Sequence, residues 1–156
     1  GNMKFMMNGA ITLGTLDGAN VEIHEHVGEE YDVIFGLKVE DIEALKLNGY
    51  DAWEYLNNDS ELKAVVNSFT DGTFSSSIEE FKSIYDELMF RNDEYFLLAD
   101  FRAYVEAQKE VERRYQDKEY WARMCLVNIA QSGFFSSDRT IQEYADDIWK
   151  IKPIND

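Results

Sequence analysis

The spacing of apolar residues changes near Gly36, which divides the chain into two parts. Before this point, the short apolar runs 11–16 and 33–36 predict two β-strands. Residues 20–27 between them predict one short helix, with Gly28 as its stop. A strand, a helix and a strand in this order are typical of a parallel sheet. Because two strands cannot form a stable sheet alone, we expect its other strands to lie elsewhere.

After residue 36, apolar residues recur every three or four positions, which predicts a series of helices. The first helix carries Val39, Ile42 and Leu45 on one face and ends at Gly49. The next two helices are predicted by the apolar stripes Leu62, Val65, Val66 and Phe69, and Ile78, Phe81, Ile84, Tyr85 and Leu88. A longer helix over 100–115 has Tyr104, Val105, Gln108 and Val111 on one side. The last two helices carry Trp121, Met124, Cys125 and Ile129, ending at Gly133, and Ile141, Tyr144, Ala145, Ile148 and Trp149, stopping before Pro153.

Polar residues at the expected starts of these helices support their boundaries, because such side chains accept the free N–H groups of a first turn. The residues that we expect in this role are Asp51 with Glu54, Ser77 with Glu80, Asp117, and Ser137 with Asp138. The fold class predicted from these patterns is α/β: mostly helical, with about two parallel strands in the first quarter.

Charge and composition exclude several functional classes. The formal net charge is −16, which argues against a broad nucleic-acid surface and against an anionic membrane surface. The single cysteine, Cys125, cannot form an internal disulfide and fits a buried small apolar residue in a reducing compartment. No apolar run is long enough to span a bilayer, and no signal peptide is evident. The chain starts at Gly1 without an initiator methionine, so we expect a fragment whose first residue can be a cleavage scar.

Lys4 is the only cation among the first 37 residues, and it lies among apolar neighbours: Met3, Phe5, Met6 and Met7. Such a lysine is either a surface residue that buries its aliphatic stem or a desolvated amine. Desolvation disfavours the ammonium form and makes the amine a nucleophile towards carbonyl groups. From the residues alone the surface interpretation is favoured, because buried lysines are rare.

The Lys4 segment belongs to a longer series of recognisable motifs. The segment Gly1–Ala10 reads Gly-Asn-Met-Lys-Phe-Met-Met-Asn-Gly-Ala and resembles the pyridoxal-phosphate attachment segment of the α-glucan phosphorylases, which include glycogen, starch and maltodextrin phosphorylases. The match continues through Thr12–Glu22, Ile34–Gly36, Asn128–Gly133 and Phe135–Ile141. The resemblance covers almost the whole chain, in order, up to the C-terminus of the family.

The resemblance implies a role for two residues of this segment. Lys4 matches the lysine that forms a Schiff base with pyridoxal 5′-phosphate in the full enzyme, although an isolated fragment can lack the cofactor. Gly1 matches the last glycine of a Gly-Thr-Gly run that opens a helix with anion-binding N–H groups. In the family the cofactor phosphate is the proton shuttle, so Lys4 would be an anchor, and the resemblance places no catalytic residue in this fragment.

The resemblance also implies a C-terminal piece of a Rossmann-like (GT-B type) enzyme. Residues 1–36 would hold the cofactor lysine and part of a sheet, and residues 37–156 the helical remainder of the same domain. The whole enzyme would release glucose 1-phosphate from α-1,4-glucan and inorganic phosphate, which are bound through the missing upstream part. We expect a cytoplasmic homodimer, without nucleic-acid or membrane partners, and an inactive isolated fragment.

The other candidate residues have structural interpretations. His24 and His26, two positions apart, point to different faces of a helix and suit surface positions better than a metal site. Asp17 and Glu22 could form a carboxylate pair, but Asp17-Gly18 fits a turn better. The triplet 137–139, Ser-Asp-Arg, is more typical of a helix cap than of a nucleophile set.

The acidic runs at 40–41 and 146–147 predict solvated helix faces. The alternative to a phosphorylase fragment is a non-enzymatic acidic helical interaction module with an incidental Lys4. Composition alone favours this alternative. Another pyridoxal-phosphate fold is disfavoured, because the residues after Lys4 continue into Asn-Gly-Ala and the segment Thr-Leu-Asp-Gly-Ala-Asn at 15–20.

Overall fold

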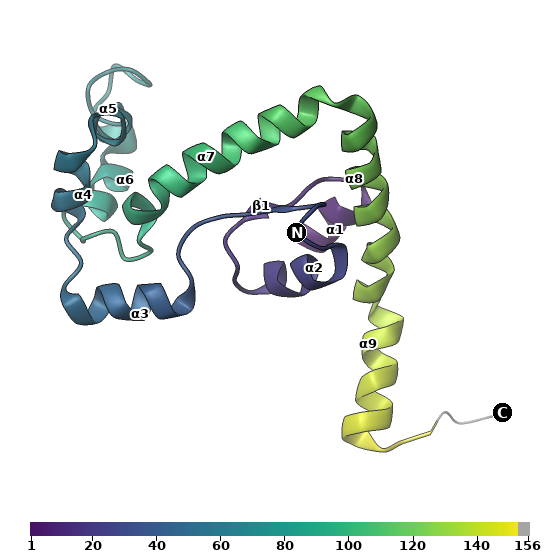
Figure 1. The fold of residues 1–156 in the computed structure, drawn as a ribbon. Helices are drawn as coiled ribbons and strands as arrows, with labels where there is room; N and C mark the ends of the chain where they lie inside the picture. Colours follow the sequence, from purple (N-terminus) through teal and green to yellow (C-terminus); the bar gives the residue numbers. More distant parts are fainter. Residues whose placement is uncertain (153–156) are drawn as a thin grey trace. The chain divides into compact units, whose positions relative to one another are not determined.

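The computed structural model describes residues 1–152, which form two compact units (Figure 1). The first unit combines residues 1–34 with the chain from Glu110 onward, and the second consists of residues 35–109. Pro153, expected to lie just beyond the last helix, is outside the described residues. Among residues 1–152, no helix is both long enough and apolar enough to cross a membrane.

The N-terminal part of the first unit confirms the predicted parallel arrangement. It contains α1 (Asn2–Met7), β1 (Leu13–Gly14), α2 (Ala19–Val27) and β2 (Val33–Ile34). The two strands are parallel, with Leu13 opposite Val33 and Gly14 opposite Ile34. Helix α2 ends at Gly28, as predicted. Each strand has only two residues, so the predicted strands 11–16 and 33–36 are too long. Neither strand has a second neighbour among the described residues that would extend its ladder.

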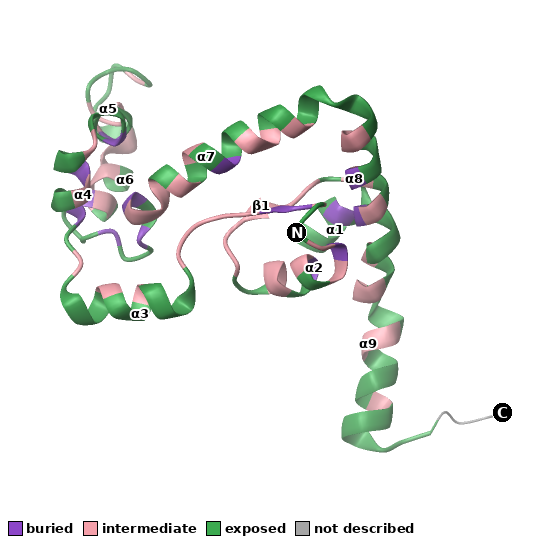
Figure 2. Ribbon diagram, in the orientation of Figure 1, coloured by how far each residue is buried: buried purple, intermediate pink, exposed green. Residues whose placement is uncertain are grey.

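The C-terminal part of the first unit is helical. It contains α8 (Lys118–Gln131), the 3₁₀ turn η1 (Ser132–Phe135), α9 (Ser137–Glu143) and the π-helix η2 (Tyr144–Trp149). The predicted apolar stripe on the last two elements lies on the surface, where Ile141, Tyr144, Ile148 and Trp149 are all exposed (Figure 2).

A small core joins the two parts of the first unit. Met6, Ile23 and Val27 are buried, and Tyr31, Val127 and Phe135 pack against them. Gly9, with a φ of +82°, permits a close approach after α1. A Cβ atom there would lie 3.3 Å from Ile129 Cδ1 and 3.4 Å from Cys125 Cβ. Cys125 is half-buried, less buried than we expected.

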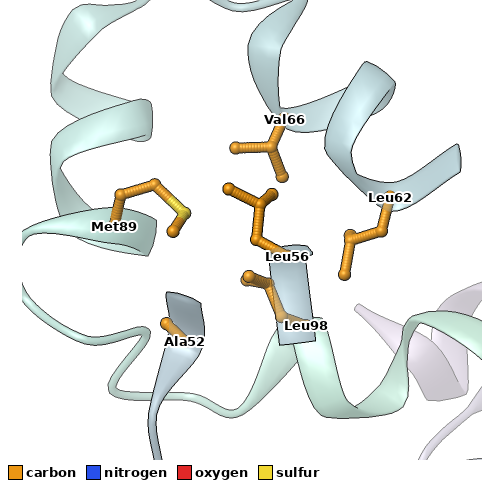
Figure 3. Packing of buried hydrophobic residues seen from close by; sticks show 6 residues of the cluster. All are labelled: Ala52, Leu56, Leu62, Val66, Met89 and Leu98. Atoms are coloured by element: carbon orange, nitrogen blue, oxygen red, sulfur yellow. The ribbon is translucent and has the colours of Figure 1, made fainter. Parts of the chain in front are cut away.

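The second unit contains four complete helices and the N-terminal part of a fifth. These are α3 (Val39–Asn48), α4 (Ala52–Asn58), α5 (Ser60–Asn67), α6 (Glu79–Met89) and α7 (Leu97–Gln116), the last of which continues into the first unit. The core residues are Ala52, Leu56, Leu62, Val66, Met89 and Leu98 (Figure 3). The predicted stripe on α5 is correct at Leu62 and Val66 but wrong at Val65, which is 46% exposed.

Most of the predicted helix ends are confirmed. Gly49 ends α3 in the left-handed conformation, and the Asp51 and Asp117 side chains cap α4 and α8. The predicted cap at Ser77 is wrong, because α6 begins at Glu79 and the Ser77 N–H donates to Ser75 Oγ within a local turn. Ser136, one residue before the predicted Ser137, caps α9.

Candidate functional site

Lys4 lies on α1, a helix of six residues that is fixed at both ends. The carbonyl of Gly1 accepts hydrogen bonds from the backbone N–H groups of Lys4 and Phe5, at 3.0 and 3.1 Å. At the other end, Asn8 Nδ2 donates to the carbonyl oxygen of Lys4 at 2.7 Å. Met6, which is fully buried, anchors the helix on the core. The backbone around Lys4 is therefore well defined.

The side chains around Lys4 point mostly outwards. Lys4 is exposed, and its apolar neighbours Met3, Phe5 and Met7 are 36%, 68% and 58% exposed. Of the two interpretations of Lys4, the described residues agree with the surface lysine. The helix presents one amine among three accessible apolar side chains.

A hollow of about 220 Å³ lies beside this helix. Its lining residues are Asn2, Phe5, Ala10, Ile11, Thr12, Leu13 and Asn20. They come from α1, from the segment leading into β1 and from the start of α2, which all belong to the first unit. Helix α1 therefore borders an accessible hollow with a mixed polar and apolar lining.

These residues fit one end of pyridoxal phosphate, the cofactor that the sequence motif implies. Lys4 offers an amine for the aldehyde, and accessible side chains such as Phe5 offer apolar contacts for a ring. Residues 1–37 contain no second cation for the phosphate group. The described N-terminal segment thus fits the aldehyde end, and the phosphate end would need ligands from other parts of a longer chain.

The turn after β1 confirms the structural role expected for Asp17. Thr15 Oγ1 donates to Asp17 Oδ2 at 2.9 Å, and the Asn20 N–H donates to the Asp17 carbonyl at 3.0 Å. Asp17 and Glu22 are both exposed, and no interaction joins them in the described structure. This turn holds Asn20, whose side chain reaches α1.

The two histidines of α2 are half-buried, which is less exposed than the surface positions that we expected. His24 is half-buried, and its Nδ1 lies 2.9 Å from Asp32 Oδ2. His26 is also half-buried, with its ring 3.6 Å from the ring of Phe134. The two rings thus have separate partners, as spacing by two residues requires. No cluster of three metal-ligand side chains occurs within residues 1–152.

Asp32 belongs to a buried polar network that sequence reasoning missed. Burial raises the pKa of the Asp32 carboxyl, and the hydrogen bond from His24 opposes this rise. Arg114 donates to the Asp32 carbonyl at 2.8 Å, and Asn128 donates to the Tyr31 carbonyl at 2.8 Å. These contacts join positions more than 80 residues apart. They hold the segment before β2 against the end of α7 and against α8, and no local motif could have revealed them.

The triplet Ser-Asp-Arg at 137–139 has a structural role, as expected, although its details differ. The capping oxygen comes from Ser136, which accepts from the Arg139 N–H. The Arg139 guanidinium donates to the Phe134 carbonyl and pairs with Glu143. These interactions leave no arrangement of a nucleophile and a base around Ser137. The acidic residues at 40–41 and 146–147 are exposed, which confirms them as solvated helix faces.

Comparison with known proteins identifies the family. A model of the carbohydrate phosphorylase family matches residues 1–151. The chain is 52% identical to the glycogen phosphorylase of Synechocystis and 49% identical to that of Bacillus subtilis, each over 155 residues and 99% of this chain. It is 48% identical to the liver form of human glycogen phosphorylase over 154 residues, or 98% of this chain. The chain spans only 18–19% of the length of these relatives. It belongs to the carbohydrate phosphorylase family.

Proposed function

We propose that this chain is the C-terminal part of a pyridoxal-phosphate-dependent α-1,4-glucan phosphorylase, with Lys4 as the cofactor lysine. The observation that carries the proposal is the placement of Lys4. It lies in the motif Gly-Asn-Met-Lys, on a helix with a defined backbone whose residues Asn2 and Phe5 line an accessible hollow. Family membership over residues 1–151 and relatives named glycogen phosphorylase support the same function.

In this proposal the residues of α1 bind and orient the cofactor. The Lys4 amine holds the aldehyde end, while the exposed apolar side chains of Met3, Phe5 and Met7 exclude water once further protein covers them. Gly1 is the proposed second cofactor residue, and its carbonyl already fixes the first turn of α1. When bound, the cofactor supplies a phosphate group that carries a proton to and from the substrate phosphate.

The remaining assignments concern the whole enzyme. Residues 1–36 and 37–156 would belong to one Rossmann-like C-terminal domain, in which β1 and β2 join further strands. The enzyme would act on α-1,4-glucan and inorganic phosphate and release glucose 1-phosphate. We further propose a cytoplasmic homodimer. The alternative, a non-enzymatic acidic module, gains no support from the family match or from the relatives.

Replacement of Lys4 tests the proposal. In the full-length protein that contains this chain, Lys4→Ala should abolish retention of pyridoxal phosphate, because the amine that holds the aldehyde is removed. Absorbance of the bound cofactor after dialysis measures retention. Lys63→Ala is the matched control, because Lys63 is an exposed lysine in the second unit. Retention by Lys4→Ala at the level of the control would refute the assignment.

The same proposal predicts that the isolated chain is inactive. Only Lys4 and Gly1 of the proposed cofactor site lie within it, and no glucan-binding segment is assigned to it. The chain should form no glucose 1-phosphate when it is mixed with glucan, phosphate and pyridoxal phosphate. Product formation above the rate without protein would show that these 156 residues hold a complete active site.

A further inference from the structure

We propose that Asn20 is a positioning residue that fixes the orientation of the Lys4 helix through the side chain of Asn2. This inference rests on the proposed function, since it concerns how the cofactor lysine is held. Asn20 lies 16 positions after Lys4, in the first turn of α2, and would not itself touch the reacting atoms.

The Asn20 side chain joins two segments by hydrogen bonds at both ends of its amide. Its Nδ2 donates to the carbonyl oxygen of Thr15 at 3.0 Å, which ties it to the turn after β1. Its Oδ1 accepts from Asn2 Nδ2 at 2.8 Å, which ties it to α1. These contacts use opposite ends of one planar amide. A rotation of the amide that breaks the hydrogen bond to Thr15 therefore also displaces the oxygen that accepts from Asn2.

Gly14 of β1 provides the space that this bridge needs. A Cβ atom at position 14 would lie 2.6 Å from Asn20 Nδ2, far inside van der Waals contact. Any other residue would therefore push the Asn20 amide away from its two partners. The backbone of Gly14 does not have a positive φ, so this steric reason, rather than a special conformation, favours glycine.

The bridge ends on the first residue of the helix that carries Lys4. Asn2 begins α1, and the Gly1 carbonyl next to it accepts from the Lys4 N–H. Asn2 and Asn20 also both line the hollow beside α1. The first turn of α1 is thus held to the turn after β1 by a side-chain bridge at the edge of this hollow.

Asn2→Ala, Asn20→Ala and Gly14→Ala in the full-length protein test this inference. Asn2→Ala should release pyridoxal phosphate about fivefold faster, as expected for the loss of one hydrogen bond. Asn20→Ala removes both hydrogen bonds of the bridge and Gly14→Ala displaces its amide, so these two variants should release the cofactor at least as fast as Asn2→Ala. All three variants should also change the circular dichroism of the bound cofactor, which reports its orientation. The double variant of Asn2 and Asn20 should release the cofactor no faster than Asn20→Ala alone, because both substitutions break the same bridge. Asn48→Ala, at an exposed asparagine of α3, is the control.

A purely structural role would give a different result. In that case Asn20→Ala would lower the thermal unfolding temperature of the cofactor-free protein but leave the release rate and the dichroism unchanged, and the inference would be wrong. Asn2 is exposed, so Asn2→Ala gives a result even if Asn20→Ala fails to fold. If Lys4→Ala retains the cofactor, the proposed function fails; if Lys4→Ala loses it and Asn2→Ala behaves like the control, only the role of Asn20 fails.

Discussion

The core of the second unit and the Lys4 helix use their apolar residues in opposite ways. In the second unit, six apolar residues from four helices are at most 4% exposed (Figure 3). In α1, by contrast, only Met6 is buried, while Met3, Phe5 and Met7 are accessible. Burial of apolar side chains stabilises a fold, whereas an accessible apolar group near an exposed amine is available to bind something else. The comparison suggests that the second unit is built for stability and the Lys4 helix for binding.

The largest expected effect is a difference in unfolding free energy between a variant of the second unit and a variant of the Lys4 helix. Leu56→Ala removes a fully buried side chain and should lower the free energy of unfolding by about 2–5 kcal/mol, through lost burial and a new cavity. Phe5→Ala removes a larger side chain that is 68% exposed, and should change stability by less than about 0.5 kcal/mol. Urea unfolding of the purified chain measures both. Equal losses would show that Phe5 contributes to stability as much as a core residue does.

A smaller effect concerns a buried carboxylate of the second unit. Asp93 Oδ2 accepts from the Tyr50 hydroxyl at 2.7 Å and from the Leu98 N–H at 2.8 Å. Asp93→Ala leaves both donors unpaired and should cost about 2–3 kcal/mol of unfolding free energy. Asp93→Asn keeps one oxygen for both donors and should cost less than about 1 kcal/mol. If chemical unfolding ranks the two variants equally, these hydrogen bonds contribute little to the fold.

The smallest effect is a pH dependence in the first unit. Burial raises the pKa of Asp32 above its ordinary value of 3.8, so the folded chain keeps this proton at pH values where the unfolded chain has lost it. The contribution of Asp32 to stability is therefore complete below 3.8 and is lost as pH rises through the raised pKa. Asp32→Asn removes the titrating carboxyl group and with it this pH dependence. The side-chain oxygen of the asparagine can still accept a hydrogen bond from His24. As pH rises from 4 towards neutrality, the free energy of unfolding of the variant should increase relative to that of the unchanged chain. Chemical unfolding at several pH values measures this difference, and a difference that stays constant with pH would contradict the prediction.

Sequence reasoning succeeded where the determining contacts are local. The parallel βαβ order, the helix stops at Gly28 and Gly49, and the caps Asp51 and Asp117 all depend on a few neighbouring residues. It failed at Ser77, because a serine three positions before a glutamate also occurs in turns. Here the Ser77 N–H donates to Ser75 Oγ within such a turn. Apolar spacing alone also could not show that Val65 faces solvent while Val66 is buried.

The candidate site was only partly predictable, for the same reason. Lys4 and Gly1 could be selected from one continuous motif, although no physical pattern alone distinguished a binding lysine from a surface lysine. The bridge between Asn2 and Asn20 depends on how α1 packs beside α2, and the space for the Asn20 amide depends on Gly14 of β1. Arg114 and Asn128 reach carbonyl groups 82 and 97 positions away, which only the folded chain brings together.

The position of the cofactor on the full-length protein tests the central claim most directly. Borohydride reduction fixes pyridoxal phosphate to the amine that holds it, and mass spectrometry of the peptides then identifies the modified lysine. We predict modification at Lys4, within the segment Gly-Asn-Met-Lys-Phe. Modification of a different lysine, or a full-length protein that carries no cofactor, would contradict the account.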